Sequence, residues 1–295
     1  MMKKRIFVIA LFFSLPVFST ILWHQITGGF CVSKILIARE LATSPRSTFG
    51  ALPEKFEAPW TYLGKGRQTY VFLSSDGKYV IKFFRIHLTS RGVASHFDAL
   101  RGSSLRKEPK KLGDWIESTF LAIDASPKKS GIVYFQPYGA KPSPLPSLTL
   151  VDALGRSYLL DGRNTSFLIQ KKATLFKEVL DQCIRDKNSE KLGQCIAQYL
   201  LLQKRLLENG VMNKDPCPFR NTGVSENGEV FDLDVGRYTK HFDQKEWKAL
   251  FDRLRHSLNR YVKKHWASCD DDRVLEAILK DLSSSKEKQI DAKVS

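Results

Sequence analysis

A chain of 295 residues can bury a full hydrophobic core, and its 42% hydrophobic and 11% aromatic content excludes an intrinsically disordered protein. With 47 Lys and Arg residues against 31 Asp and Glu residues, the formal net charge of +16 favours anionic partners such as phosphate groups, nucleic acid or acidic lipid. The basic residues are scattered in pairs, without an arginine-rich block or a basic strand interleaved with aromatic residues, so we expect no specific binding of nucleic acid.

An uncharged apolar segment, residues 6–23, follows the basic N-terminus MMKKR. Its 18 residues are just long enough to span a bilayer, which predicts a signal anchor; a signal peptide cleaved after Ser19 is the alternative. The preceding positive charges predict a cytoplasmic N-terminus, with the main domain anchored or exported on the far side of the membrane. We expect this segment to pack against nothing in the folded domain, and protein lacking residues 1–30 to remain folded.

Residues 24–57 are of mixed composition with several serines and two prolines, and we interpret them as a linker with room for one short helix. Between residues 58 and 172, alternating apolar runs predict a β-rich lobe with an antiparallel sheet and a hairpin turned by Asp76-Gly77. One helix is expected at residues 109–124, where apolar residues recur at helical spacing. Further strands are expected at residues 131–139, 148–153, 157–161 and 165–170.

Apolar residues at helical spacing predict a second, mainly helical lobe at residues 173–282. A polar tail, residues 283–295, is expected to be disordered. Helices are expected at residues 175–184 and 192–206, from Asp243 to residue 262, and at residues 274–282. The order of strands, helices, a small hairpin and further helices predicts an α+β fold of two lobes with a cleft between them.

The cysteine and histidine patterns contain no recognisable zinc-ligand spacing. The chain has five cysteines without a CxxC pair and six histidines without an HExxH motif. Cys183 and Cys195 each lie on the apolar stripe of a predicted helix, which predicts buried free thiols.

Two features of the β-rich lobe suit the binding of phosphate groups. Gly64 and Gly66 sit at the mouth of a predicted hairpin, where missing side chains let backbone amides approach phosphate oxygens; an ordinary glycine-bearing turn is the alternative. Lys82 lies in the strongly apolar strand YVIKFF and needs a partner if that strand is buried. The alternative is an edge strand whose lysine faces water.

The segment NKDPCPFRNTGVSENGEVFDLDVGR, which begins at Asn213, concentrates carboxylates in an otherwise basic chain. The Asn-Gly pair near its centre predicts a tight turn between two short strands. Asp215 and Asn221 would lie in the loop before the first strand, and Asp234 would end the second. Carboxylate and amide oxygens that converge in this way suit a hard divalent cation such as Mg²⁺; for Asp215 alone, a capping or turn role is the alternative.

Taken together, these features resemble the protein-kinase-like superfamily in their order and spacing over roughly residues 60–262. GKGRQTYVF resembles the glycine-rich loop, and VIK resembles the strand that ends in the nucleotide-binding lysine. NKD resembles the catalytic-loop triplet, and DVG resembles the metal-binding DFG. The resemblance implies a two-lobed kinase-like fold with ATP and Mg²⁺ as cofactors.

The resemblance also implies a role for each candidate residue. Lys82, beside the loop of Gly64 and Gly66, would hold the α- and β-phosphates of the nucleotide, and Glu117 on the predicted helix would orient Lys82. We therefore expect Lys82 to pair with Glu117 or Asp234.

On the other side of the predicted cleft, Asp215 would accept the proton of the attacking hydroxyl group. Asn221 and Asp234 would hold Mg²⁺, and we expect all three residues to converge on one point.

The chain departs from the family pattern at several positions. Asn213 and Lys214 stand where the pattern has histidine and arginine, and Asp215 and Asn221 are six residues apart where the pattern has five. The third glycine of the loop and an APE-like segment are missing. These departures favour a compact relative, closer to small-molecule or atypical kinases than to an ordinary Ser/Thr kinase.

The function that this resemblance implies is an ATP- and Mg²⁺-dependent phosphotransferase that acts on a protein or small-molecule hydroxyl group and is attached to the membrane through residues 6–23 or exported. The alternative is a kinase-like pseudoenzyme that serves as a nucleotide- or partner-binding module, and a third reading is a membrane-attached binding protein of another fold.

Overall fold

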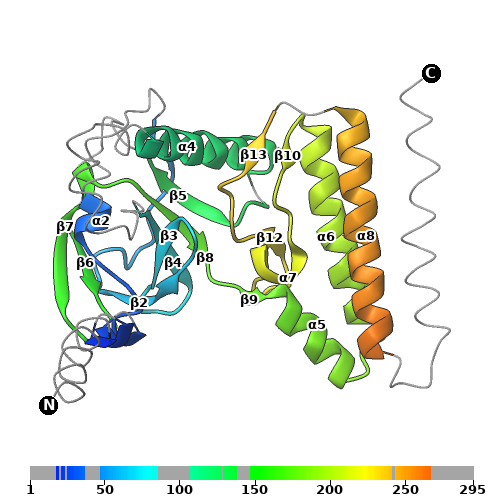
Figure 1. Cartoon of the computed structure of the whole chain (residues 1–295), viewed down its shortest axis with the longest axis horizontal. Coiled ribbons are helices and arrows are strands. Elements are labelled where there is room, and N and C mark those ends of the chain that lie inside the picture. The colour runs from blue at the N-terminus through cyan, green and yellow to red at the C-terminus, as the bar shows by residue number, and fades with distance from the viewer. Residues whose placement is uncertain are drawn as a thin grey trace, which may run out of the picture. The chain divides into compact units, whose positions relative to one another are not determined.

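The computed structural model describes residues 18–19, 21–23, 25–36, 47–85, 107–127, 129–137, 147–240 and 243–266. The chain divides into two compact units, the first made of Met1–Gly113 and Val133–Lys172, the second of Asp114–Ile132 and Ala173–Ser295. Strands dominate the first unit and helices the second (Figure 1), which confirms the α+β class.

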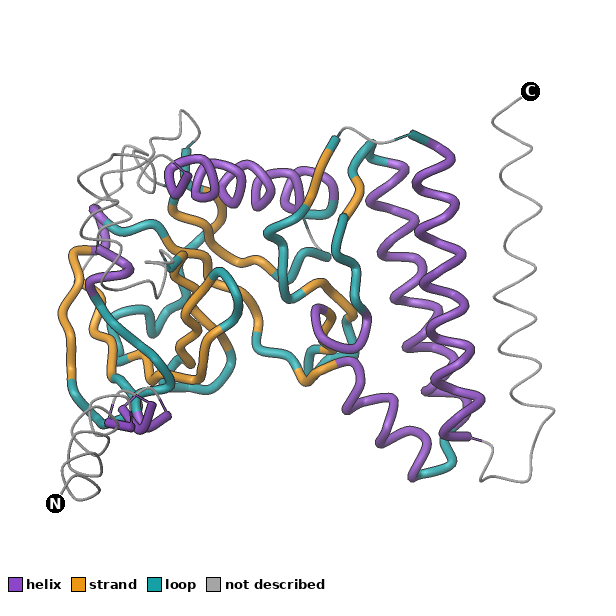
Figure 2. Tube along the Cα trace, in the orientation of Figure 1, coloured by secondary structure: helices purple, strands orange, loops and turns teal. Residues whose placement is uncertain are grey.

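The described residues of the first unit form an eight-stranded sheet in the order β1-β5-β8-β4-β3-β2-β6-β7. The sheet is strongly curled (Figure 2). Its strands are β1 (Phe49–Gly50), β2 (Trp60–Lys65), β3 (Thr69–Leu73), β4 (Tyr79–Phe84), β5 (Ile132–Gln136), β6 (Ser147–Val151), β7 (Ser157–Asp161) and β8 (Phe167–Lys171). A 3-10 turn, η2 (Gly162–Asn164), precedes β8.

One strand pair departs from the antiparallel sheet that the sequence predicts. β2 and β6 run parallel, with Trp60 beside Leu150 and Thr61 beside Val151. Parallel neighbours need a long crossover connection, and here β3, β4 and β5 lie between the two strands in the sequence. Side chains alternate in the same way in parallel and antiparallel strands, so the apolar pattern could not distinguish the two pairings.

Aromatic side chains fill the core of the first unit. Phe30 packs edge-on against Tyr70 and Phe72, with ring centroids 5.2 Å and 5.3 Å away. Phe56 and Ile35, which lies in the short helix α2 (Ser33–Leu36), are also buried in this core. The structure thus differs from the linker expected at residues 24–57, because three of its apolar side chains belong to the core.

The start of the chain also contacts the first unit. The guanidinium of Arg156 lies 5.4 Å from the ring centroid of Trp23, where we expected no packing. Deletion of residues 1–30 would remove Phe30 from the aromatic core, so the truncated protein is no longer expected to remain folded. Most of the apolar segment 6–23 lies outside the described residues, and no helix among those described is long and apolar enough to cross a membrane.

Helix α4 (Lys107–Ala125) agrees with the helix expected at residues 109–124. It begins in the first unit and continues in the second. The second unit further contains α5 (Phe176–Arg185), α6 (Ser189–Glu208), α7 (Pro218–Asn221) and α8 (Gln244–Trp266). Its short strands are β9 (Thr174–Leu175), β10 (Met212–Asn213), β11 (Thr222–Val224), β12 (Val230–Asp232) and β13 (Tyr238–Thr239).

Helices α5, α6 and α8 enclose the apolar core of the second unit, and α6 and α8 run side by side (Figure 1). Local signals mark the end of α6 and the start of α8. Gly210, with a φ of 70°, follows the end of α6, and the carboxylate of Asp243 accepts a hydrogen bond from the N–H of Glu246 at the start of α8. The helix expected at residues 274–282 and the tail at residues 283–295 lie outside the described residues.

The core of the second unit also contains the two cysteines assigned to helical stripes. Cys183 and Cys195 are buried and carry free thiols, as predicted. Burial raises the pKa of the Cys195 thiol to about 11, so this thiol is protonated at neutral pH and is a poor nucleophile.

Gly131 occupies a position that no other residue fits. Its φ is 69°, and a Cβ atom built there would lie 2.5 Å from the ring of Phe231. Gly228, in the turn between β11 and β12, also has a positive φ of 77° but open space around the equivalent position. Alanine at Gly228 therefore introduces backbone strain alone, whereas alanine at Gly131 introduces backbone strain and a steric clash.

We expect Gly131→Ala to lower the free energy of unfolding by about 3 kcal/mol, from a left-handed backbone at about 1 kcal/mol and overpacking at about 2 kcal/mol. Gly228→Ala should show the backbone effect alone, about 1 kcal/mol. Urea unfolding followed by circular dichroism measures both changes. Equal losses in the two variants would show that Phe231 relaxes without penalty.

Candidate active site

The carboxylate-rich segment is built around the fully buried Asp232, at the end of β12. The side chains that donate to its carboxylate come from four parts of the second unit. They are Asn213 at 3.0 Å, the Tyr238 hydroxyl at 2.6 Å, the Thr222 hydroxyl at 3.4 Å and Gln203 at 3.4 Å. Burial raises the pKa of this carboxyl group, and the hydrogen bonds partly oppose the rise.

The loop that holds Asp215 is fixed by hydrogen bonds at both of its ends. The Asn213 side chain, which donates to Asp232, accepts the N–H of Asp215 at 2.9 Å. The side-chain amide of Asn221 donates to the carbonyl oxygen of Asp215, also at 2.9 Å. Between them, the single turn α7 accommodates the six-residue spacing, and the carboxylate of Asp215 remains half-buried.

Asp234 follows directly after this hairpin and is exposed. One of its carboxylate oxygens accepts the N–H of Gly236 at 3.0 Å. Its neighbour Leu233 donates its N–H to the carbonyl oxygen of Asn221 at 2.6 Å. Backbone and side-chain hydrogen bonds therefore link Asp215 to Asn221, and Asn221 to the residue before Asp234.

Glu117 lies on an exposed position of α4, in the part of that helix that belongs to the second unit. The next residue, Ser118, is buried; its hydroxyl donates to the carbonyl oxygen of Val235 and accepts the N–H of Tyr238. Glu117 directly precedes Ser118 and Asp234 directly precedes Val235, so the hydrogen bond between Ser118 and Val235 joins the neighbours of the two carboxylates.

Lys82 projects from the inner strand β4, between β3 and β8, so the alternative of an edge strand is wrong. Its neighbours Ile81 and Phe83 point into the aromatic core, and strand alternation places Lys82 on the opposite face. There its ammonium group is half-buried and donates to the side-chain oxygen of the fully buried Gln170 at 2.7 Å. The predicted partners Glu117 and Asp234 belong to the second unit, and their pairing with Lys82 stays a prediction.

Gly64 and Gly66 lie at the end of β2 and in the turn to β3, as expected from the sequence. The N–H of Gly66 donates to the carbonyl oxygen of Thr69 at 2.8 Å, which closes the turn. A Cβ atom at Gly64 would meet nothing within 4 Å, and neither glycine has a positive φ. The fold of the first unit therefore places no steric demand for glycine at position 64.

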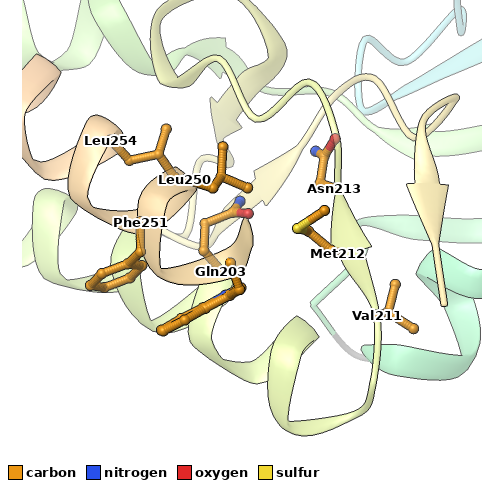
Figure 3. Close-up of a pocket in the computed structure, with 8 residues that line it drawn as sticks. Gln203, Val211, Met212, Asn213, Leu250, Phe251 and Leu254 are labelled. Carbon is orange, nitrogen blue, oxygen red and sulfur yellow. The ribbon is translucent and has the colours of Figure 1, made fainter. Parts of the chain in front are cut away.

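A small cavity of about 10 Å³ adjoins the Asp232 cluster (Figure 3), lined by Gln203, Val211, Met212, Asn213, Trp247, Leu250, Phe251 and Leu254. It has room for about one water molecule and is far smaller than a ligand pocket. Among the described residues, no group of three or more His, Cys, Asp and Glu side chains could hold a metal ion. The predicted ligands Asn221 and Asp234 supply one amide and one carboxylate, which is fewer than the three acidic, histidine or cysteine side chains of such a group.

Sequence reasoning missed the supporting role of Asp232 and of Ser118. The sequence contained a signal for Asp232, because this carboxylate follows the apolar residues Val230 and Phe231 in a predicted strand. A carboxylate in a buried strand needs hydrogen-bond donors. The donors themselves lie 6 to 29 residues away along the chain and in four different elements, so no local pattern identifies them. Ser118 had no sequence signal, since its partners are about 120 residues distant.

No family model matches the chain, and no curated protein matches it. Among solved structures it is similar to the bifunctional kinase-methyltransferase WbdD, with 14% identity over 74% of this chain and 43% of that chain and a TM-score of 0.33. A co-crystal structure of WbdD with the kinase inhibitor LY294002 also has 14% identity, over 76% of this chain and 45% of that chain, with a TM-score of 0.33.

A third similar structure is the Rv3197–erythromycin complex from Mycobacterium tuberculosis, with 14% identity over 80% of this chain and 67% of that chain and a TM-score of 0.32. The chain spans less than half the length of the WbdD chains that it matches. At such low identities and TM-scores these similarities carry no argument about the function of this chain.

The buried Asp232 carboxylate should make stability depend on pH. Its pKa is higher in the folded than in the unfolded chain, so the folded state binds the proton more tightly. The free energy of unfolding should therefore fall as the pH rises from about 4, the ordinary carboxyl value, through the raised pKa. Asp232→Asn should remove this fall, measured by urea unfolding at a series of pH values.

Tyr238→Phe is the matched control for this titration. It keeps the Asp232 carboxylate but removes the donor at 2.6 Å, so the fall in stability should persist and move to higher pH. Superimposable pH profiles for the wild type and Asp232→Asn would contradict the proposed titration.

Proposed function

We propose that this chain is a kinase-like phosphotransferase that uses ATP and Mg²⁺ to phosphorylate a hydroxyl group of an acceptor. The observation that carries the proposal is the pair of hydrogen bonds in the second unit that link Asp215 to Asn221, and Asn221 to Leu233, the residue before Asp234. Their order, with Lys82 and the glycine turn earlier in the chain, matches the order in which the kinase-like superfamily places its functional groups.

Asn221 and Asp234 are suited to hold Mg²⁺. The amide nitrogen of Asn221 faces the carbonyl oxygen of Asp215, which leaves its amide oxygen for a cation. The exposed carboxylate of Asp234 supplies a second oxygen, and hard cations such as Mg²⁺ take oxygen ligands and keep several waters. Bound there, the ion would neutralise negative charge on the phosphate groups of the nucleotide.

The first unit offers groups suited to the nucleotide phosphates. The open space at Gly64 has no cause in the packing of the unit, and close approach of a phosphate group to the backbone would account for glycine there. Lys82 lies in the same meander, and Gln170 accepts a hydrogen bond from its ammonium group. An ammonium group held in this way can contact phosphate oxygens without first losing the freedom of a flexible side chain.

Asp215 is the proposed proton acceptor. Its N–H and its carbonyl oxygen are both hydrogen-bonded within the loop, so the backbone holds the carboxylate in a defined place. A half-exposed carboxylate can accept the proton of a substrate hydroxyl group while the oxygen of that group forms its bond to phosphorus. The buried Asp232 supports this loop through Asn213 and is not itself placed to meet a substrate.

A kinase-like pseudoenzyme that binds nucleotide without turnover is the second candidate. The observation that favours it is the use of Asn213, at the position where the family pattern has histidine, as a structural bridge between Asp232 and the Asp215 loop. Nucleotide binding is common to both candidates, and only the transfer of the phosphoryl group separates them.

Membrane attachment through residues 6–23 is a further part of the proposal, supported by the uncharged apolar sequence of that segment. The full-length chain should remain with the membrane fraction after extraction at alkaline pH. Its release into the supernatant would contradict attachment by this segment.

Lys82→Met should abolish the thermal stabilisation that ATP and Mg²⁺ give to the wild-type chain, because the phosphates lose their cation. At a nucleotide concentration 100 times the dissociation constant, that stabilisation is about 2.7 kcal/mol. Thermal unfolding with and without nucleotide measures it. Lys78→Met, at an exposed lysine in the turn between β3 and β4, is the matched control and should keep the full effect.

Asp215→Ala and Asp234→Ala should separate catalysis from binding. The first should keep the nucleotide-dependent stabilisation but lose phosphoryl transfer by about 100-fold or more, because a proton acceptor is removed. The second should weaken the Mg²⁺-dependent part of nucleotide binding itself. Transfer of radiolabelled phosphate to the chain or to offered acceptors is the measurement, and wild-type binding without any transfer would favour the pseudoenzyme.

A further inference from the structure

Three basic side chains gather near the turn that joins β2 to β3, on the face of the sheet opposite Lys82. Lys65 on β2 pairs in register with Tyr70 on β3, so their side chains lie on one face. The guanidinium of Arg85 lies 5.6 Å from the ring centroid of the same Tyr70. The hydroxyl of Tyr70 donates at 2.9 Å to the carbonyl oxygen of Gly29, five residues before Lys34.

The basic residues of this group, Lys34, Lys65 and Arg85, repel one another. After burial, the charges of Arg85 and then Lys34 lower the pKa of the Lys65 amino group, as expected for cations in close proximity. None of the three forms an ion pair within the part of the chain that the structure describes. A group of like charges without a carboxylate partner is suited to bind an anion from outside.

Exposed apolar side chains precede Lys34 in the sequence. Of the ten large hydrophobic side chains that are exposed in the described part of the chain, five belong to residues 18–26. They are Phe18, Ile21, Leu22, Trp23 and Ile26. Exposed apolar side chains that gather in this way mark an interaction surface more often than an ordinary solvated surface.

Hydrogen bonds fix the apolar residues to the hairpin that carries the cations. Thr27 donates to the carbonyl oxygen of Trp23 through both its N–H and its hydroxyl group, at 2.9 Å and 2.7 Å. The hydroxyl of Tyr62 on β2 donates to the carbonyl oxygen of Gly28 at 3.1 Å. Burial raises the pKa of Tyr62 to about 12, so this hydroxyl stays protonated and keeps its donor role at neutral pH.

We infer that Lys34, Lys65 and Arg85 bind the phosphate headgroups of an anionic bilayer while the apolar side chains of residues 18–26 enter its interface. A bilayer offers phosphate groups and apolar chains next to each other, which matches a cationic group beside exposed aliphatic residues. A nucleic acid offers the phosphates but no apolar surface for Ile21, Leu22 and Ile26. This site is independent of the proposed phosphotransferase activity, since it lies on the opposite face of the sheet from Lys82.

The test compares binding of the full-length chain to neutral phosphatidylcholine vesicles and to vesicles with added phosphatidylserine, measured by flotation after cell-free synthesis. Insertion of apolar residues contributes to the binding of both kinds of vesicle. The ratio of the two affinities therefore isolates the contribution of the anionic headgroups. Each basic residue near an anionic surface raises partitioning about fivefold. Lys34→Gln, Lys65→Gln and Arg85→Gln combined should therefore lower the ratio about tenfold or more.

A second triple variant, Lys191→Gln, Lys248→Gln and Lys264→Gln, removes the same charge from exposed positions of the second unit and should leave the ratio within about twofold of wild type. Equal losses in the two triple variants would overturn the site in favour of attraction by net charge, and no loss in either would assign binding to the apolar segment alone. Inorganic phosphate at matched ionic strength should not compete. Competition by it would overturn the bilayer as the source of the anion.

Discussion

The burial of the Asp232 carboxylate is the constraint on which the second unit depends. A carboxylate removed from water is destabilising unless donors surround it, and here the donors come from α6, β10, β11 and β13. These elements are brought to one point by a single side chain. Loss of the carboxylate would leave Asn213 and Tyr238 buried without their partner, so the arrangement is satisfied only when it is complete.

This constraint explains how an exposed site can be held in place. Asn213 contacts Asp232 with one end of its amide and the N–H of Asp215 with the other, so the buried carboxylate positions the exposed loop. Asp234, two residues beyond Asp232, lies after the end of β12 and turns outward. The groups proposed to meet a ligand are thus supported by buried groups, as a preorganised site requires.

The first unit uses the two faces of one sheet for different purposes. Side chains alternate along β4, so Ile81 and Phe83 join the aromatic core while Lys82 projects from the other face toward Gln170. On the core face, Arg85 lies beside Tyr70, which is the register partner of Lys65. Lys82 therefore lies on one face of the sheet, and Lys65 and Arg85 lie on the other.

Local chemistry in the sequence determined the four long helices α4, α5, α6 and α8, the Asp243 and Gly210 signals at the start of α8 and the end of α6, the Asn227-Gly228 turn and the order of the candidate site residues. These features depend on neighbours within a few residues, which a single sequence displays. Only the tertiary structure decided that β2 and β6 run parallel, that Phe30 belongs to the core and that Asp232 is buried among distant donors. Each of these depends on residues far apart in the chain, and their meeting is set by packing and by the need to satisfy buried polar groups, which leave no local pattern to read.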